Sequence, residues 1–420
     1  MKNYPDRETI SYTLNEKTDL RRLFIVVSPD RELVGHLRQR DTRPTIHDYM
    51  AQIRSVIDQA KAAFRANGFE HKLAFANIFL ADLSKKQLVR WMFRELDEIF
   101  IVPTSSPVMT YIPQCPADGS LIAVEIFAIA GFERNRGLTC RDASITIEKR
   151  GVRWCYVGDV TPDASSLGAY NRALWAFRRL ERVLISQDMS PSNLVRTWIY
   201  QGNLTLDEGR VQRYNELNRA RSTFFEGRRF VEPLLFPGYN GIAFPASTGI
   251  GADDVDITMA ATAIATDRDD VLVVPIENPG QTPAFDYGSR YSQKSPKFSR
   301  ATAIEYDDLC RILISGTASI TDSETRFPDD ITAQTHQTLD NIAALIGCDN
   351  LSKHELQGYS ATLRDLDVYR VYIKNPRDYP VVRAICEERI GDAPGIYTIA
   401  DVCRDDLLVE IEGTTSVSRG

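Results

Sequence analysis

The stretch from Cys310 to Gly347 reads CRILISGTASITDSETRFPDDITAQTHQTLDNIAALIG. Its first seven residues are mostly apolar and predict a buried strand that ends in small polar residues. A helix is expected from Asp329 to Ile346, because apolar side chains recur there at roughly helical spacing (Ile331, Leu339, Ile342, Ala343 and Ile346). One acid, Glu324, lies in the polar loop between the two elements. The loop therefore carries either a solvated charge or an acid held over a substrate.

The same order of elements continues to the end of the chain. A strand at DVYRVYIKN (367–375) and a helix at RDYPVVRAICEERIG (377–391) follow the quoted stretch. Two further strands are expected at GIYTIADV (395–402) and LLVEIEG (407–413). The C-terminal part is therefore predicted to be a β-α-β-α-β-β unit.

Two earlier segments repeat this unit, which makes internal repetition the main organising feature. Their helices are expected at residues 46–67, 85–100, 166–186 and 207–225. Three copies predict an α+β fold of three mixed sheets, each with two helices packed on one face. The expected division of the chain is 18–135, 145–265, an insertion or connector rich in Pro, Gly, Ser and Tyr at 266–303, and 304–420.

Composition excludes several functional classes. The chain has 43% hydrophobic and 25% charged residues, as soluble globular proteins do, and its net charge of −7 lacks the basic footprint of nucleic-acid binding. No apolar run is long enough to span a membrane, and the N-terminus has no secretory signal, so a cytoplasmic protein is expected. The seven cysteines and five histidines show no metal-binding or disulfide spacing, and no nucleotide-binding loop is present. We expect neither cofactor nor metal.

The repeat, with DITAQTHQTLDNIAALI (330–346) and LLVEIEG in it, resembles the reactive-intermediate deaminase family (RidA/YjgF). That family has a chorismate mutase-like fold and forms trimers with ligand clefts between subunits. The resemblance implies that the three units close into an intramolecular pseudo-trimer. Three independent beads on a string are the alternative.

RidA deaminases hold the substrate carboxylate with an arginine shortly after a proline on the penultimate strand. The matching positions here are Met109, Ser247 and either Gly395 or Ile396. None of these side chains supplies the two parallel hydrogen bonds of a guanidinium group. The usual deamination chemistry is therefore disfavoured.

A second resemblance covers residues 151–413 and is to the chorismatases, which release pyruvate from chorismate. It rests on VRTWIY, RYNELNRAR, PASTGIG, IENPGQTPAFDYGSRYSQKSPKFSRAT, SGTASI, AQTHQTLDNIAALI and ADVCRDDLLVEIEG, in that order. It implies a chorismate-cleaving enzyme of secondary metabolism whose ring product is a dihydroxycyclohexadiene carboxylate or a hydroxybenzoate. The N-terminal unit has no close counterpart that the sequence can place in that family.

Pyruvate release begins with protonation of a vinyl carbon, which needs a positioned acid with a raised pKa. The resemblance implies that Glu324 is this acid. It also implies that Arg221, Arg300 and Tyr214 hold the substrate carboxylates. Tyr214 and Arg221 are seven residues apart and share one face of the expected helix.

Four further residues are candidate ligands of the substrate. Thr317 and Ser319 alternate at a strand end, and Ser247 is a possible donor where the RidA arginine is missing. Arg196 lies in an otherwise apolar strand, so it either pairs with a buried acid or faces a ligand. Some chorismatases resemble this site but carry a cysteine at the position matched to Thr317, associated with hydroxybenzoate as product, and the threonine argues against that product here.

Two other functions remain open on the sequence. The chain could act on a different small carboxylate, or it could be a RidA-like module that binds a metabolite without turnover. Every alternative has a small-molecule ligand and neither nucleic acid nor membrane as partner. The expected assembly is a monomeric pseudo-trimer or a weak homo-oligomer.

Overall fold

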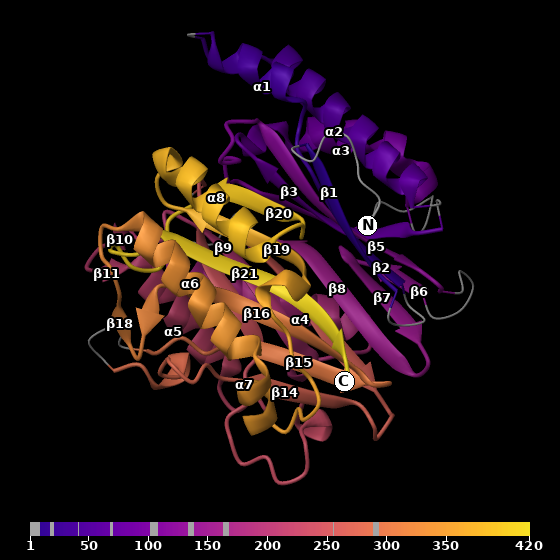
Figure 1. The fold of residues 1–420 in the computed structure, drawn as a ribbon, viewed down its shortest axis with the longest axis vertical. Coiled ribbons are helices and arrows are strands. Elements are labelled where there is room, and N and C mark those ends of the chain that lie inside the picture. The colour runs from indigo at the N-terminus through magenta and orange to yellow at the C-terminus, as the bar shows by residue number, and fades with distance from the viewer. Residues whose placement is uncertain are drawn as a thin grey trace.

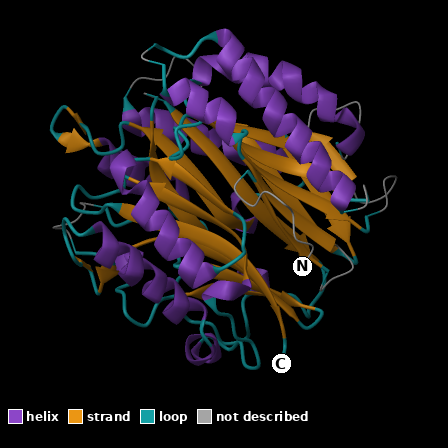
Figure 2. Cartoon of the chain, turned by 45° about the horizontal axis from the view of Figure 1, so that its top comes forward, coloured by secondary structure: helices purple, strands orange, loops and turns teal. Residues whose placement is uncertain are grey.

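The computed structural model describes residues 9–16, 21–40, 42–67, 70–100, 108–132, 138–162, 168–254, 256–288 and 294–420. The strands fill the centre of the molecule and the helices lie outside them (Figure 2). Within the described ranges, no helix is long and apolar enough to cross a membrane.

The first sheet is formed by the N-terminal part of the chain (Figure 1). Its order is β1-β2-β5-β3-β4, with bounds Ile10–Asn15, Arg21–Val27, Ile122–Ala130, Lys72–Leu80 and Val108–Ile112. The helices of this unit are α1 (Arg31–Arg38), α2 (Ile46–Ala66) and α3 (Lys86–Met92). Helix α2 begins where expected, because Thr45 and Asp48 form a reciprocal capping box.

The second sheet has the order β12-β9-β13-β8-β7-β6, with bounds Ala246–Ala252, Leu194–Gly202, Ile257–Thr266, Val152–Val160, Ser144–Lys149 and Leu138–Arg141. Helices α4 (Ala169–Ser186) and α5 (Arg213–Phe225) belong to this unit. A small hairpin of β10 (Asp207–Glu208) and β11 (Val211–Gln212) precedes α5. It replaces the first turns of the helix expected at 207–225.

The third sheet has the order β14-β15-β16-β21-β19-β20, with bounds Leu272–Ile276, Ala301–Tyr306, Leu309–Ala318, Val409–Ser418, Leu366–Ile373 and Gly395–Ile399. Its helices are α6 (Ile331–Ile346), α7 (Cys348–Lys353) and α8 (Tyr379–Ile390). Between β16 and α6 lies a short hairpin of β17 (Ile320–Thr321) and β18 (Glu324–Thr325).

The three sheets share one topology, which confirms the three predicted β-α-β-α-β-β units. Strands β2, β5, β3 and β4 occupy the same positions as β8, β13, β9 and β12, and as β16, β21, β19 and β20. In every unit the last two of these four strands are parallel and the others are antiparallel, so each sheet is mixed.

The structure adds elements that the sequence did not predict. Strands β1, β6, β7, β14 and β15 extend the sheets at one edge, and β14 lies inside the segment expected to be an insertion. The helix expected at 85–100 is α3 followed by a 3-10 helix from Phe93 to Ile99. The helix expected from residue 166 is described from Ala169, and residues 163–167 lie outside the described part.

The units pack on one another and are not separate beads. One apolar core contains Phe24 and Phe127 of the first unit, Trp154 of the second and Ile304 of the third. Strand β4 lies against β8 and β12 lies against β16. Between the first and third units, Asn15 of β1 donates a hydrogen bond to Asp367 of β19 over 3.0 Å. The three units therefore contact one another pairwise around a common core.

A buried ionic network joins the units at their centre. Arg370 of β19 donates to Glu125 of the first unit and to Glu412 of β21, and Arg196 of β9 pairs with Glu412. Burial alone would raise the pKa of Glu412, but these two arginines hold it below its usual value. The buried charges of this network are paired with one another, and such pairing offsets the cost of removing charged groups from water.

Candidate active site

A cavity lies between the second and third units, where β12 and β16 face each other. Helix α5 contributes Tyr214 and Arg221, and β12 contributes Ser247. Arg300 reaches it from the residue before β15, and Glu410 from the start of β21. The other described residues of the lining are Gly249, Tyr287, Pro296, Phe298, Gly316, Ala318, Ile320, Cys403 and Arg404.

Arg221 is a buried guanidinium group with no carboxylate partner among the described residues. The side chain is 2% exposed, and its Nε donates to no atom of the described residues. Burial lowers the pKa of Arg221 below its usual value. The ring centre of Phe298 lies 6.0 Å from the guanidinium carbon. An unpaired buried charge is costly, so this cavity favours an anionic ligand.

The guanidinium group of Arg300 is held by two hydrogen bonds to the protein, while its Nε remains available. It donates to the carbonyl of Thr282 over 3.1 Å and to the hydroxyl of Tyr287, while its buried Nε has no partner in the described part of the chain. Phe298 lies 5.5 Å from this guanidinium carbon as well. Arg404 lies 5.4 Å from the ring centre of Tyr287. Three arginines thus line the cavity around two aromatic rings, and they could hold two carboxylates.

Glu410 is the one carboxyl group among the described lining residues. It is buried, and burial raises its pKa to about 8, helped by the neighbouring charge of Glu412 and opposed by Arg300 and Arg196. The group is therefore protonated at neutral pH and can act as a proton donor. A neutral acid beside fixed cations is the arrangement that protonation of an anionic enol ether requires.

The predicted site residues divide into two groups. Arg221, Arg300, Tyr214 and Ser247 line the cavity together, and their role as substrate ligands stays a prediction. Ser247 also accepts a hydrogen bond from the Thr197 hydroxyl over 2.8 Å.

Glu324 is not among the described lining residues of this cavity. It is exposed on β18, because the chain leaves the sheet through the β17–β18 hairpin directly after β16. Its role as the acid over the substrate stays a prediction, and the residues on either side of it, Ser323 and Thr325, accept hydrogen bonds from Arg404 of the lining. Glu410, on the final strand, is a second candidate for the acid because it lines the cavity.

Thr317, Ser319 and Arg196 are buried but do not line the cavity. Side chains of β16 alternate, so Gly316 and Ala318 face the cavity and Thr317 faces away. The Thr317 and Ser319 hydroxyls donate to the carbonyls of Ser315 and Arg326, over 3.0 Å each. Arg196 belongs to the central ionic network, which is the structural pairing that the sequence left open.

Among the lining residues that sequence reasoning missed, five have aromatic, sulfur-containing or charged side chains: Tyr287, Phe298, Cys403, Arg404 and Glu410. One signal was present for the acid. Glu410 and Glu412 alternate in the apolar strand LLVEIEG, and a charge in a buried strand needs a partner or a cleft. Cys403 carried no such signal, and burial raises the pKa of its thiol to about 12.

The structure is similar to a crystal structure of a chorismatase. The TM-score is 0.63 at 21% sequence identity, and the match covers 82% of this chain and 93% of the other. The chain has the chorismatase fold. The matched part of this chain is about 344 residues long, whereas the second and third units together, from Leu138 to the end, contain 283 residues. The chorismatase fold therefore includes part of the N-terminal unit, for which the sequence offered no counterpart.

Sequence similarity points to the same group of proteins. A 3-hydroxybenzoate synthase from Streptomyces hygroscopicus is 35% identical over 235 residues, covering 54% of this chain and 64% of that protein. A chorismatase from Streptomyces rapamycinicus is 36% identical over 230 residues, covering 53% and 64%. The chain thus matches slightly less than two thirds of the length of these relatives. No protein-family model matches the sequence.

Proposed function

We propose that this chain is a chorismatase, which protonates the enolpyruvyl ether of chorismate and releases pyruvate. The observation that carries the proposal is the meeting of a protonated acid, Glu410, with the unpaired guanidinium of Arg221 in one buried cavity. Chorismate has two carboxylates and an acid-labile vinyl ether, so its charge and its reactivity both match this lining.

In the proposed reaction the proton of Glu410 goes to the vinyl CH2 group, and the ether becomes an oxocarbenium ion. Arg221 and Arg300 hold the two carboxylates, and Arg404 adds further positive charge near the anionic substrate. An oxygen nucleophile then attacks the cationic carbon, and the resulting carboxylate of Glu410 takes back a proton from it. Collapse of this adduct breaks the ether bond and releases pyruvate.

The nucleophile decides the ring product. Attack by water consumes one water and gives a dihydroxycyclohexadiene carboxylate, whereas attack by a ring hydroxyl leads to a hydroxybenzoate with no net water. We favour the hydroxybenzoate. The threonine at position 317 was an argument against this product because some chorismatases carry a cysteine there. Thr317 faces away from the cavity, however, and the sulfur atom that lines the cavity belongs to Cys403. The threonine therefore does not argue against a hydroxybenzoate. The S. hygroscopicus relative is itself a 3-hydroxybenzoate synthase.

Cellular context is part of the proposal. All seven cysteines are free thiols, which suits a reducing cytoplasm. The three units contact one another within one chain, which suits a protein that works as a monomer. A role in secondary metabolism follows the Streptomyces relatives.

The test is to incubate the full chain with chorismate, couple pyruvate to lactate dehydrogenase, and identify the ring product by liquid chromatography. Run in D2O, the reaction is expected to place one deuterium in the methyl group of pyruvate, trapped as lactate. Thermal stabilisation by chorismate without pyruvate would reject the enzymatic proposal and favour a metabolite-binding protein.

A further inference from the structure

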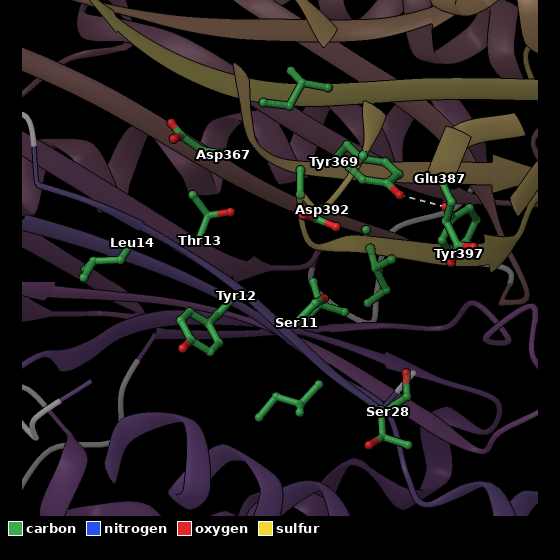
Figure 3. Close-up of a pocket in the computed structure, with 18 of the residues that line it drawn as sticks. Ser11, Tyr12, Thr13, Leu14, Ser28, Asp367, Tyr369, Glu387, Asp392 and Tyr397 are labelled. Carbon is green, nitrogen blue, oxygen red and sulfur yellow. Dashed lines mark hydrogen bonds between the residues drawn. The ribbon is translucent and has the colours of Figure 1, made fainter. Parts of the chain in front are cut away.

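A second, larger cavity opens between the third and first units (Figure 3). Its volume is about 1280 Å³, and it is independent of the candidate active site because the two share no lining residue. Strand β1 forms one wall, with Ser11 and Thr13 on it. Helix α8 and strand β20 form the facing wall.

This cavity is the counterpart of the candidate active site under the threefold repetition. Helix α8 corresponds to α5, and strands β20, β2 and β5 correspond to β12, β16 and β21. On β5, Ala123 lies two residues before the central Glu125, as Glu410 lies two before Glu412 on β21. A methyl group thus occupies the position of the proposed acid. The cavity has no counterpart of that proton donor.

Three tyrosines gather on the wall made by the third unit. The hydroxyls of Tyr369 and Tyr397 are 2.8 Å apart, and their rings meet edge to face with centres 6.0 Å apart (Figure 3). The ring of Tyr379 lies 5.6 Å from that of Tyr397. Gly395 permits this arrangement, because a Cβ there would lie 2.2 Å from the ring of Tyr369.

The charge of the cavity is opposite to that of the candidate active site. Its described lining holds seven carboxyl groups and three arginines. Asp118 and Glu387 act electrostatically on Tyr379, and Figure 3 labels Glu387 and Asp392 beside the tyrosine group. Arg383 is already paired with Glu387 over 2.6 Å and donates to the Tyr379 hydroxyl over 3.0 Å. It therefore differs from Arg221, which has no acid beside it.

We infer that this cavity is a second ligand site, which binds a small organic cation: an ammonium group carried on an apolar body. Aromatic faces and nearby carboxylates together recognise alkylammonium groups. A metal ion fits less well, because no group of three or more His, Cys, Asp or Glu in the described part of the chain could hold one. An anion such as chorismate would meet the surplus of carboxylates.

The experiment uses the full chain and benzyltrimethylammonium chloride, with phenylacetate as the anionic control. Binding is followed by saturation-transfer NMR and titration calorimetry. We expect saturable binding of the cation, weakened about fivefold or more in Glu387→Gln, which removes a carboxylate and releases the charge of Arg383. Glu388→Gln is the matched control, because that exposed neighbour on α8 does not line the cavity.

A second variant and a competition complete the test. Tyr379→Leu removes an aromatic face and is expected to weaken binding of the cation. Thermal unfolding checks that this variant is folded. A hydroxybenzoate, which the other cavity would hold, is expected not to displace it. No saturation up to 10 mM, equal affinity in Glu387→Gln and wild type, or displacement by hydroxybenzoate would each overturn the inference, whether or not the chain cleaves chorismate.

Discussion

Gly316 leaves the space that the carboxyl group of Glu410 occupies. A Cβ atom at residue 316 would lie 1.9 Å from Oε1 of Glu410, which no real contact allows. Strand β16 therefore accommodates the proposed acid by lacking a side chain at the position where β21 presents one.

Gly316→Ala is expected to move this carboxyl group out of position. Because a general acid contributes about 10²–10⁴ in rate, we predict a loss of pyruvate release of about 100-fold or more. The matched control is Gly35→Ala in α1, where a Cβ meets no atom within 4 Å. Full activity of Gly316→Ala, with the fold intact, would show that the position of Glu410 does not matter.

The raised pKa of Glu410 predicts the pH dependence of activity. The acid must carry its proton, so kcat/KM is expected to be level between pH 6 and 7 and to fall as pH rises through about 8. The unfolded chain releases this proton near 4.5, so the stability that this group contributes is complete below that pH and is lost by about pH 8. A pH–rate profile tests the first point, and thermal unfolding at several pH values tests the second. A rate that stays level to pH 9.5 would contradict the assignment.

Arg221→Met separates binding from stability. The variant loses a carboxylate clamp, so we expect KM for chorismate to rise about 100-fold. It also removes a buried charge without an acid partner, so Tm is expected to stay level or to rise. Arg219→Met, on the same helix but exposed and paired with Glu216, is the control. A variant with a lower Tm and an unchanged KM would make Arg221 a structural residue.

Arg370→Met is expected to act on stability alone. It leaves Glu125 and Glu412 buried without their shared cation, and breaking such a network costs about 3–5 kcal/mol. Chemical denaturation measures this free energy of unfolding. Arg229→Met breaks the exposed pair with Glu232 and is expected to cost less than about 1 kcal/mol. Equal effects of the two variants would mean that the central network does not hold the units together.

The repeat was predictable because the periodicity of apolar residues within each strand and helix is a local feature of the sequence. The edge strands were not, because short strands such as β6 and β14 are defined by partners distant in sequence. The hairpin before α5 was missed for the same reason, since Asp207 and Glu208 read equally well as the first turn of a helix.

The site was predictable in part. Arg221, Arg300, Tyr214 and Ser247 came from motif resemblance, and the fold brings all four to one cavity. Glu324 came from the same resemblance and stays a prediction, whereas Glu410 was not singled out from the sequence. The alternation of side chains along β16, and the pairing of β16 with β21, decide which acid faces the cavity. That information lies in the register between the two strands.

The most direct test of the account is the single-turnover rate of pyruvate release from chorismate by Glu410→Gln, compared with wild type and with Glu324→Gln. The account predicts a loss of about 100-fold or more for Glu410→Gln and a rate within about twofold of wild type for Glu324→Gln. A fast Glu410→Gln variant, or a slow Glu324→Gln variant with its fold intact, would contradict it.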